Sequence, residues 1–304
     1  MNPYQYKSNL RDYTFVLQGS NAIWRHYSLS FSSGFETKYL GNKEICAEYY
    51  FPIGTVKAPV SILVHGMGDS SIIPCRMIAR TLAKKGIASL IIYLVFHARR
   101  ITSEVKKRYP RLSPEEWFES YQMSVTDVHQ ILDWVQSRPE IDQSRISIVG
   151  ISFGSFVASI AMALDKRIKS GVLIESGGNS DKITRFSALL RWQYRQSEQE
   201  FQKNQKQYLS YLDSVNQWGF ENTEATKISY LTDTLTFANT LRGRPVMMIN
   251  ALWDEIIPKR ATHDLWDSLG NPPISWFPAT HASIWIWFPL IGPKIAKFLT
   301  EQAG

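Results

Sequence analysis

A serine between two glycines, with a strand-like segment before it and a helix-like segment after it, constrains the fold more than any other feature. Residues 145–149 form a run rich in β-branched side chains, typical of a strand buried on both faces of a parallel sheet. Residues 150–154 read Gly-Ile-Ser-Phe-Gly, the pattern G-x-S-x-G, and residues 155–161 are small and apolar. The segment therefore predicts a strand, a sharp turn that carries Ser152, and a helix.

The two glycines have a physical explanation. A serine hydroxyl stands clear of the sheet only if its turn is strained and the strand and helix backbones nearly touch, so the residues two positions away must be tiny. Gly150 and Gly154 meet that demand. The backbone N–H of Phe153, at the start of the helix, can then donate to a developing oxyanion. Ser152 is accordingly the candidate nucleophile.

This segment resembles the nucleophile elbow of the α/β-hydrolase superfamily, and the likeness extends from about residue 58 to the C-terminus. The resemblance implies an α/β fold of the α/β-hydrolase type, with a mostly parallel central sheet flanked by helices and a helical cap inserted late in the chain. Three strand-like segments before residue 52 predict an antiparallel entry to the sheet. We expect residues 1–176 and 244–304 to form the core domain and residues 177–243 the cap.

A second glycine-rich turn follows the predicted strand at residues 59–64. It reads His65-Gly66-Met67-Gly68 and resembles the oxyanion-hole loop of the superfamily. The resemblance implies that the backbone N–H of Met67 is the second oxyanion donor, beside that of Phe153. We expect His65 to brace this loop through hydrogen bonds rather than to transfer protons.

An acid and a base follow two later predicted strands. Asp254 lies about four positions beyond the strand at 245–250, where the superfamily places its triad carboxylate, and His281 follows the strand at 274–277. Parallel strands end at one edge of a sheet, so Ser152, Asp254 and His281 are expected to converge there. His281 would take the Ser152 proton, and Asp254 would hold the imidazole tautomer.

Two alternative assignments remain open. Glu175, at the end of the strand at 168–174, is an alternative acid, because some relatives carry the acid after that strand. His263, in a predicted helix, is an alternative to His281. The dehalogenase branch of the fold uses a carboxylate nucleophile, and Ser152 argues against that chemistry.

The composition changes between residues 175 and 244, which are rich in Gln, Lys and Glu. Aromatic side chains interleave even the Gln-rich stretch at 196–207, so we expect amphipathic helices rather than disorder. The aromatics of this region are Trp192, Tyr194, Phe201, Tyr208, Tyr211, Trp218, Phe220, Tyr230 and Phe237. With residues 284–288 after His281, they predict a pocket for an apolar acyl or aryl group. The alternative is that they only pack the cap and the last helix into the core.

The formal net charge of +7 comes largely from residues 76–111, where one acidic residue, Glu104, accompanies Arg76, Arg80, Lys84, Lys85, Arg99, Arg100, Lys106, Lys107, Arg108 and Arg111. We expect a solvated face, and the alternative is attraction to anionic lipid or an acidic substrate. Arg99 and Arg100 follow the predicted strand at 87–94, where open α/β sheets place ligands. They are candidates for substrate contacts, although salt bridges that fix the loop are the preferred interpretation.

Several features predict a soluble, cytoplasmic protein without nucleic-acid modules. Cys46 and Cys75 lie in apolar surroundings and are expected to be reduced. Residues 1–15 lack the apolar stretch of a signal peptide. The longest apolar runs, 87–96 and 284–291, are shorter than the roughly 18–20 residues that span a bilayer. Contact with a membrane surface would therefore be peripheral.

The expected activity is that of a serine esterase. The chain should cleave small-molecule carboxylic esters through an acyl-enzyme, without a cofactor or a metal. One alternative is an acylaminoacyl-type peptidase or amidase on the same fold, although no propeller domain precedes the hydrolase. Another is a catalytically silent binding protein.

Overall fold

The computed structural model describes residues 2–8, 12–68, 72–97, 100–101, 103–108 and 112–302. Within these ranges, nine strands form one sheet in the order β1-β2-β3-β5-β4-β6-β7-β8-β9. The strands are β1 (Tyr13–Ser20), β2 (Trp24–Ser32), β3 (Glu44–Pro52), β4 (Ala58–Val64), β5 (Ala88–Ile92), β6 (Ile141–Ile151), β7 (Ile168–Ile174), β8 (Val246–Ala251) and β9 (Ile274–Phe277).

The sheet divides into an antiparallel and a parallel part. Strands β1, β2 and β3 pair antiparallel with one another, and β3 pairs antiparallel with β5. From β5 across to β9 every neighbouring pair is parallel. The carboxyl ends of β4 to β9 therefore share one edge of the sheet, as the predicted α/β-hydrolase fold requires.

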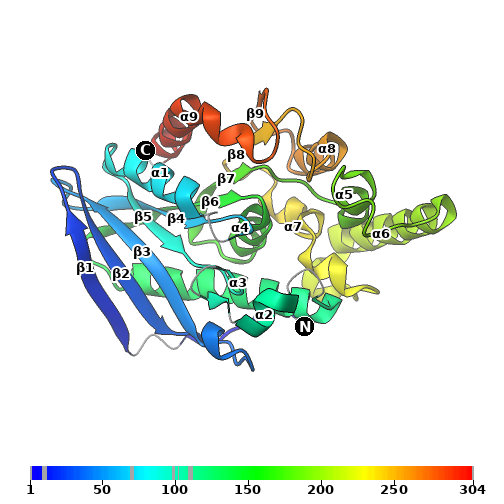
Figure 1. Cartoon of the computed structure of the whole chain (residues 1–304), viewed down its shortest axis with the longest axis horizontal. Coiled ribbons are helices and arrows are strands. Elements are labelled where there is room, and N and C mark those ends of the chain that lie inside the picture. Colours follow the sequence, from blue (N-terminus) through cyan, green and yellow to red (C-terminus); the bar gives the residue numbers. More distant parts are fainter. Residues whose placement is uncertain are drawn as a thin grey trace.

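Helices cover both faces of the sheet (Figure 1). The helices of the described ranges are α1 (Ile72–Ala83), α2 (Ser103–Arg108), α3 (Pro114–Gln136), α4 (Phe153–Leu164), α5 (Ser180–Phe186), α6 (Glu198–Trp218), α7 (Thr234–Leu241), α8 (Lys259–Ser268) and α9 (Phe288–Glu301). Helices α1 and α9 cover one face, while α3, α4 and α7 cover the other.

Side chains of the parallel strands alternate between the two helical layers. On β4, Val60 and Ile62 join the core with α3 and α4, whereas Leu63 joins the core with α1 and α9. This alternation follows from the period of two along a strand, and it explains why a strand covered on both faces is a continuous apolar run. The layers bury the sheet and leave the strand ends to carry polar chemistry.

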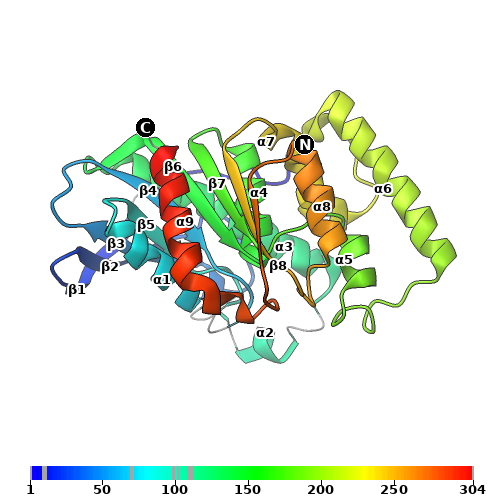
Figure 2. The same cartoon turned by 90° about the horizontal axis from the view of Figure 1, so that it is seen from above.

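Residues 177–243 contain α5, α6 and α7 together with short 3₁₀ turns. Helix α6 lies at the end of the molecule opposite β1 to β3, as two views show (Figures 1 and 2). It begins with a capping box between Ser197 and Glu200 and buries Phe201, Tyr208 and Tyr211. The Gln-rich stretch is thus an amphipathic helix. The division of the chain into core domain and cap stays a prediction.

Two smaller features bear on the sequence-based expectations. Cys75 is buried, and no disulfide joins it to Cys46. Arg100 is buried as well: it forms an ion pair of 2.6 Å with Asp127 and donates to the carbonyls of Tyr93 and Asn42. Arg100 therefore fixes its loop, and Arg99 lies outside the described residues. Among the helices of the described ranges, none combines the length and apolar character needed to cross a bilayer.

Candidate active site

The turn between β6 and α4 holds Ser152 in a strained conformation. Its backbone has φ 51° and ψ −120°, a region that side chains other than glycine rarely adopt. A Cβ atom on Gly150 would lie 2.4 Å from the carbonyl oxygen of Gly154, and one on Gly154 would lie 2.3 Å from that of Val64. No side chain fits in either place, which confirms why the pattern needs glycine on both sides.

The structure brings Ser152, His281 and Asp254 together in one hydrogen-bonded chain. His281 Nε2 lies 2.9 Å from Ser152 Oγ, and His281 Nδ1 lies 2.8 Å from Asp254 Oδ2. Because Nδ1 faces a carboxylate, it carries the imidazole proton, and Nε2 is free to accept the proton of the serine hydroxyl. The arrangement can therefore remove a proton from Ser152.

Backbone contacts orient the acid. Asp254 lies in the turn after β8, and its Oδ1 accepts the N–H groups of Ile256 and Ile257, each at 2.8 Å. The other carboxylate oxygen is thereby directed at His281. A hydrogen bond of 3.0 Å from Trp253 N–H to the carbonyl of Ala279 ties this turn to the one that carries His281. The two turns hold acid and base at a fixed separation.

The structure brings Glu175 close to the site as well. It follows β7 with φ 52°, and its Oε1 lies 3.6 Å from His281 Nδ1, beyond hydrogen-bond distance. Burial and the neighbouring carboxylates of Asp254 and Glu255 raise the pKa of Glu175 to about 10. Geometry thus favours Asp254 as the partner of His281. His263 is exposed on α8, and its ring lies against Trp266 and Trp276.

The glycine-rich loop after β4 runs beside Ser152. A Cβ atom on Gly66 would lie 3.3 Å from Ser152 Cβ, and Met67 lines the same cavity as Ser152 and Phe153. His65 braces the loop: Nδ1 donates to the carbonyl of Gly66 at 2.6 Å, while Nε2 accepts the Leu94 N–H at 3.1 Å.

His65 is also unsuited to proton transfer. Burial and the nearby His97 lower the pKa of His65 to about 3, so its imidazole is neutral at physiological pH. Its expected bracing role is confirmed.

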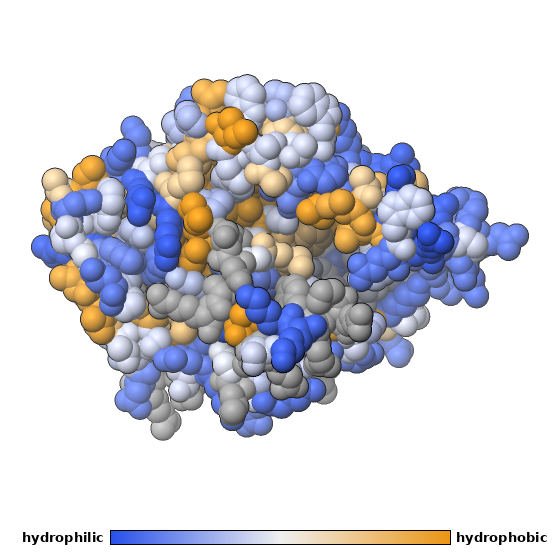
Figure 3. Space-filling view, in the orientation of Figure 1, coloured by the Kyte–Doolittle hydropathy of each residue, from blue (hydrophilic) through white to orange (hydrophobic). Residues whose placement is uncertain are grey.

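A largely apolar cavity of about 360 Å³ opens at Ser152. Its lining comes from α3, α4, α5, the segment after α5, the 3₁₀ turn at Ile228–Thr232 and the turn after Asp254. It includes Trp117, Phe118, Tyr121, Phe156, Ile183, Leu190 and Ile257. Figure 3 views this side of the molecule, where hydrophobic side chains gather around a hollow near the centre of the face. The volume and lining are those of a small-molecule pocket.

The origin of that lining differs in part from the sequence-based expectation. Residues 284–288 are absent from the cavity wall: Ile284 is buried in the core with α1 and α9, and Trp285 and Trp287 pack against that core. The start of α3 takes their place through Trp117, Phe118 and Tyr121. These aromatics follow β5 in the chain, and open α/β sheets place ligands at the carboxyl ends of their strands, so the sequence could have identified them as candidates.

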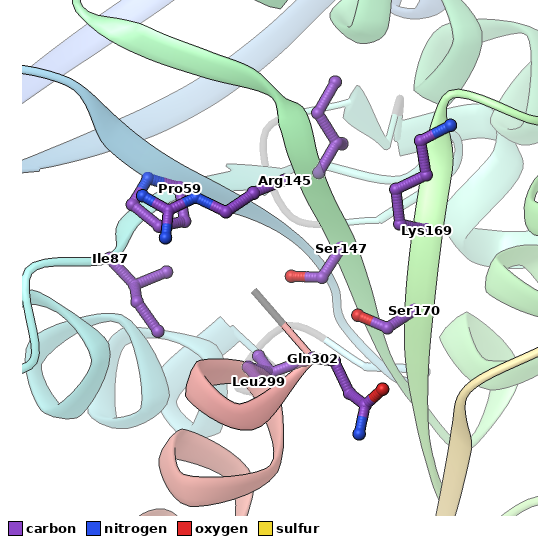
Figure 4. Close-up of a pocket in the computed structure, with 9 residues that line it drawn as sticks. Pro59, Ile87, Arg145, Ser147, Lys169, Ser170, Leu299 and Gln302 are labelled. Carbon is purple, nitrogen blue, oxygen red and sulfur yellow. The ribbon is translucent and has the colours of Figure 1, made fainter. Parts of the chain in front are cut away.

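Another hollow lies at the opposite, amino-terminal edge of the strands. Figure 4 shows it among Pro59, Ile87, Arg145, Ser147, Lys169, Ser170, Leu299 and Gln302. It holds about 10 Å³, barely what a single water molecule needs. Since it lies at the opposite edge of the sheet from Ser152 and has no room for a substrate, we assign it no role.

Comparisons with known proteins identify the family to which this chain is related. The model of the family described as "Glucuronyl esterase, fungi" matches residues 73–263, which is more than half of the chain. A search of the curated proteins finds no match.

Solved esterase structures share the fold. Acetyl xylan esterase 1 from Thermoanaerobacterium sp. JW/SL YS485 aligns with a TM-score of 0.64 and 14% identity, over 100% of this chain and 92% of that one. Acetyl xylan esterase from Paenibacillus sp. R4 gives 0.62 and 18%, over 95% and 88%. A cold-adapted esterase from an Arctic intertidal metagenomic library gives 0.62 and 16%, over 94% and 97%.

Proposed function

The chain belongs to this glucuronyl esterase family, and from that premise we propose that Ser152, His281 and Asp254 are the catalytic triad of a carboxylic ester hydrolase. That the chain is a carboxylic ester hydrolase follows from the family itself. The assignment of roles rests on one observation, the continuous hydrogen-bonded chain of 2.9 Å and 2.8 Å through the two nitrogens of His281.

The mechanism follows from the protons in that chain. His281 Nε2 takes the hydroxyl proton as Ser152 Oγ attacks the ester carbonyl carbon, and the tetrahedral intermediate forms. The imidazolium that results donates its proton to the leaving alcohol, which leaves an acyl group on Ser152. Water, activated by the same imidazole, then attacks the acyl-enzyme and releases the acid. Asp254 stabilises the imidazolium and holds its tautomer throughout.

The backbone N–H groups of Met67 and Phe153 form the proposed oxyanion hole. Phe153 begins α4, where the N–H groups of a helix have no acceptor within the helix. The loop of Met67 runs against Ser152, with no side chain on Gly66 to hold it away. Donors fixed by strand and helix need not reorganise as negative charge develops on the substrate oxygen.

The cavity supports a substrate with an apolar acyl or aryl group. Most of its wall is aromatic or aliphatic, and its polar side chains are a few hydroxyl groups such as Ser180, Thr184 and Ser229. Each methylene buried there contributes about 0.8 kcal/mol, or about fourfold in binding. We expect kcat/KM for p-nitrophenyl esters to rise from acetate to hexanoate, and a steep fall beyond acetate would contradict an apolar pocket.

Family membership favours a more specific second candidate, an ester of a glucuronyl group. The hydroxyl groups of such an acyl group suit the apolar wall poorly, whereas an aryl alcohol suits it well. Benzyl and methyl esters of glucuronic acid, assayed beside the p-nitrophenyl series, test this candidate. It predicts faster cleavage of the benzyl ester than of the methyl ester, and equal rates would contradict it.

Substitution of the nucleophile tests the proposed activity as a whole. Ser152→Ala should reduce ester turnover by about 10⁶ while the fold persists, because the covalent route is lost. The same assay with aminoacyl amides separates an esterase from the peptidase or amidase alternative. Near-normal turnover in the purified Ser152→Ala protein would contradict the proposal, and a wild type inactive on every substrate would favour a silent binding protein.

A further inference from the structure

Three side chains at the carboxyl edge of the sheet bring ligand atoms together. Glu175, Asp254 and His281 each place one donor atom within 4.8 Å of the others. His281 Nδ1 lies 2.8 Å from Asp254 Oδ2 and 3.6 Å from Glu175 Oε1. A tetrahedral Zn²⁺ bound at about 2.0–2.2 Å by imidazole and carboxylate separates such atoms by about 3–3.5 Å. The two separations from His281 Nδ1 lie close to that range.

Glu175 contributes a ligand atom that proton transfer does not use. Its side chain is 2% exposed, and its Oε1 has no hydrogen-bond partner among the described residues although it faces His281 Nδ1. The backbone holds it there, through a hydrogen bond of 2.8 Å from the Glu175 N–H to the carbonyl of Ile249. A buried carboxyl oxygen without a donor is costly, so this atom is available to a cation.

The cluster also contains more carboxyl side chains than basic side chains. Glu255 adds a third carboxyl, whose Oε2 accepts the backbone N–H of His281 at 3.0 Å. Over the described ranges of the chain, the ion pairs of Glu175 and Asp254 are those with His281 alone. One imidazole nitrogen thus lies among several carboxyl oxygens, a mixed set of ligand atoms that a divalent transition-metal cation can bind.

We propose that Glu175, Asp254 and His281 form an inhibitory Zn²⁺ site, with water in the fourth position. The imidazole nitrogen favours zinc over Mg²⁺ and Ca²⁺, which prefer oxygen ligands alone. The inhibitory effect of the zinc ion rests on the proposed function. Zinc bound to Nδ1 of His281 displaces the proton there, and the neutral imidazole then carries its proton on Nε2. Nε2–H cannot accept the Ser152 proton, so the bound metal stops acylation.

Equilibrium binding tests the site without any ester. Wild-type protein and Ser152→Ala, each competing with a chromophoric chelator for Zn²⁺, should bind one ion per chain. Loss of one ligand in Glu175→Gln or in His281→Gln should weaken binding about tenfold or more. His263→Asn removes an exposed histidine of α8 and serves as the matched control, with wild-type affinity expected. Zinc affinity equal to wild type in Glu175→Gln, or no binding by the wild type, would overturn the proposal.

The rate of ester cleavage measures the effect of bound Zn²⁺. Zn²⁺ should inhibit the wild type with a constant that matches the binding constant, EDTA should restore the rate, and Mg²⁺ should not inhibit. For Glu175→Gln, the inhibition constant relative to the variant's own uninhibited rate should rise about tenfold or more. Binding can be measured whether or not the chain cleaves esters, so a failed triad does not hide the site. An active enzyme that binds no zinc overturns this inference alone.

Discussion

At the scale of single residues, two carboxyl groups compete for the same nitrogen of one histidine. Asp254 Oδ2 lies 2.8 Å from His281 Nδ1, and Glu175 Oε1 lies 3.6 Å from it. The closer oxygen belongs to a carboxylate whose other oxygen is already held by two backbone N–H groups. Such an oriented acceptor fixes the imidazole, whereas the more distant carboxyl makes no hydrogen bond to it.

Paired substitutions separate these two carboxyl groups. Asp254→Asn should lower kcat by about 10⁴, because the amide leaves the imidazole in a wrong or unfixed tautomer. Glu175→Gln should lower it far less. Both variants are compared with one ester at one pH, and the opposite order of losses would make Glu175 the acid.

Gly154 has a single-residue role of a different kind. Its missing Cβ would meet the carbonyl oxygens of Val64 and His65 at 2.3 Å and 2.4 Å, both backbone atoms that cannot swing away. Gly154→Ala should therefore destabilise the fold by about 3 kcal/mol or more. Gly19→Ala is the control, because nothing lies within 4 Å of a Cβ there. Urea unfolding of the two variants with equal midpoints would contradict the close approach.

At the scale of elements, Glu48 ties strands to a helix. It is buried on β3 and accepts from Arg76 of α1 at 2.6 Å and from the Tyr93 hydroxyl at 2.6 Å, with His26 of β2 at 3.3 Å. Burial alone would raise the pKa of Glu48, yet hydrogen bonds from His26, Arg76 and Tyr93 outweigh it and lower the pKa below its ordinary value of 4.5.

The sign of the pH dependence follows from that lowered pKa. Ionised Glu48 stabilises the fold above its unfolded pKa of 4.5, and this contribution is lost as pH falls toward the lower folded value. Glu48→Gln should cost about 2 kcal/mol at pH 7, with a smaller difference from wild type at pH 3.5. Denaturant unfolding at both pH values measures this. Glu301→Gln, on the exposed face of α9, is the control. A difference that grows in acid would contradict the assigned network.

The bounds of strands and helices were predictable from the sequence where neighbouring residues determine them. The strands β7 and β9 have the predicted bounds. The sequence Ser113-Pro114-Glu115-Glu116 also explains locally why α3 begins at Pro114, because Ser113 is its N-cap and forms a capping box with Glu116. The aromatic run at 284–288 shows where prediction from local sequence fails. Nothing local tells whether Trp285 packs on the core or lines the cavity, because that depends on where α9 and α1 meet. The strand order, with β5 between β3 and β4, is equally non-local.

At the scale of the whole molecule, the cavity at Ser152 lies between the helices that cover the sheet and the segment that begins with α5. One wall comes from α3 and α4, which cover the sheet, and the other from α5 and from Leu190 and Tyr194. Ser152 lines the same cavity, so we expect substrate choice to depend on elements far apart in the chain. The cytoplasmic location and the cap as a separate domain stay predictions.

A variant in the cavity wall tests this arrangement. Tyr121 of α3 borders the cavity, and its ring contacts that of Phe153 with centroids 4.9 Å apart. Tyr121→Ala should lower kcat/KM for a p-nitrophenyl hexanoate several-fold more than for the acetate, because only the longer acyl chain reaches that wall. Equal losses for the two esters would indicate a general disturbance of the turn rather than lost contact with the acyl chain.

The central claim is that His281 activates Ser152 as a nucleophile, and covalent labelling tests it most directly. A fluorophosphonate reacts with an activated serine, and the mass of the intact protein then rises by one phosphonyl group. The account predicts one label per chain on the wild type, located at Ser152 by peptide mass spectrometry, and none on Ser152→Ala or His281→Gln. A label on another residue, or equal labelling of Ser152→Ala, would contradict it.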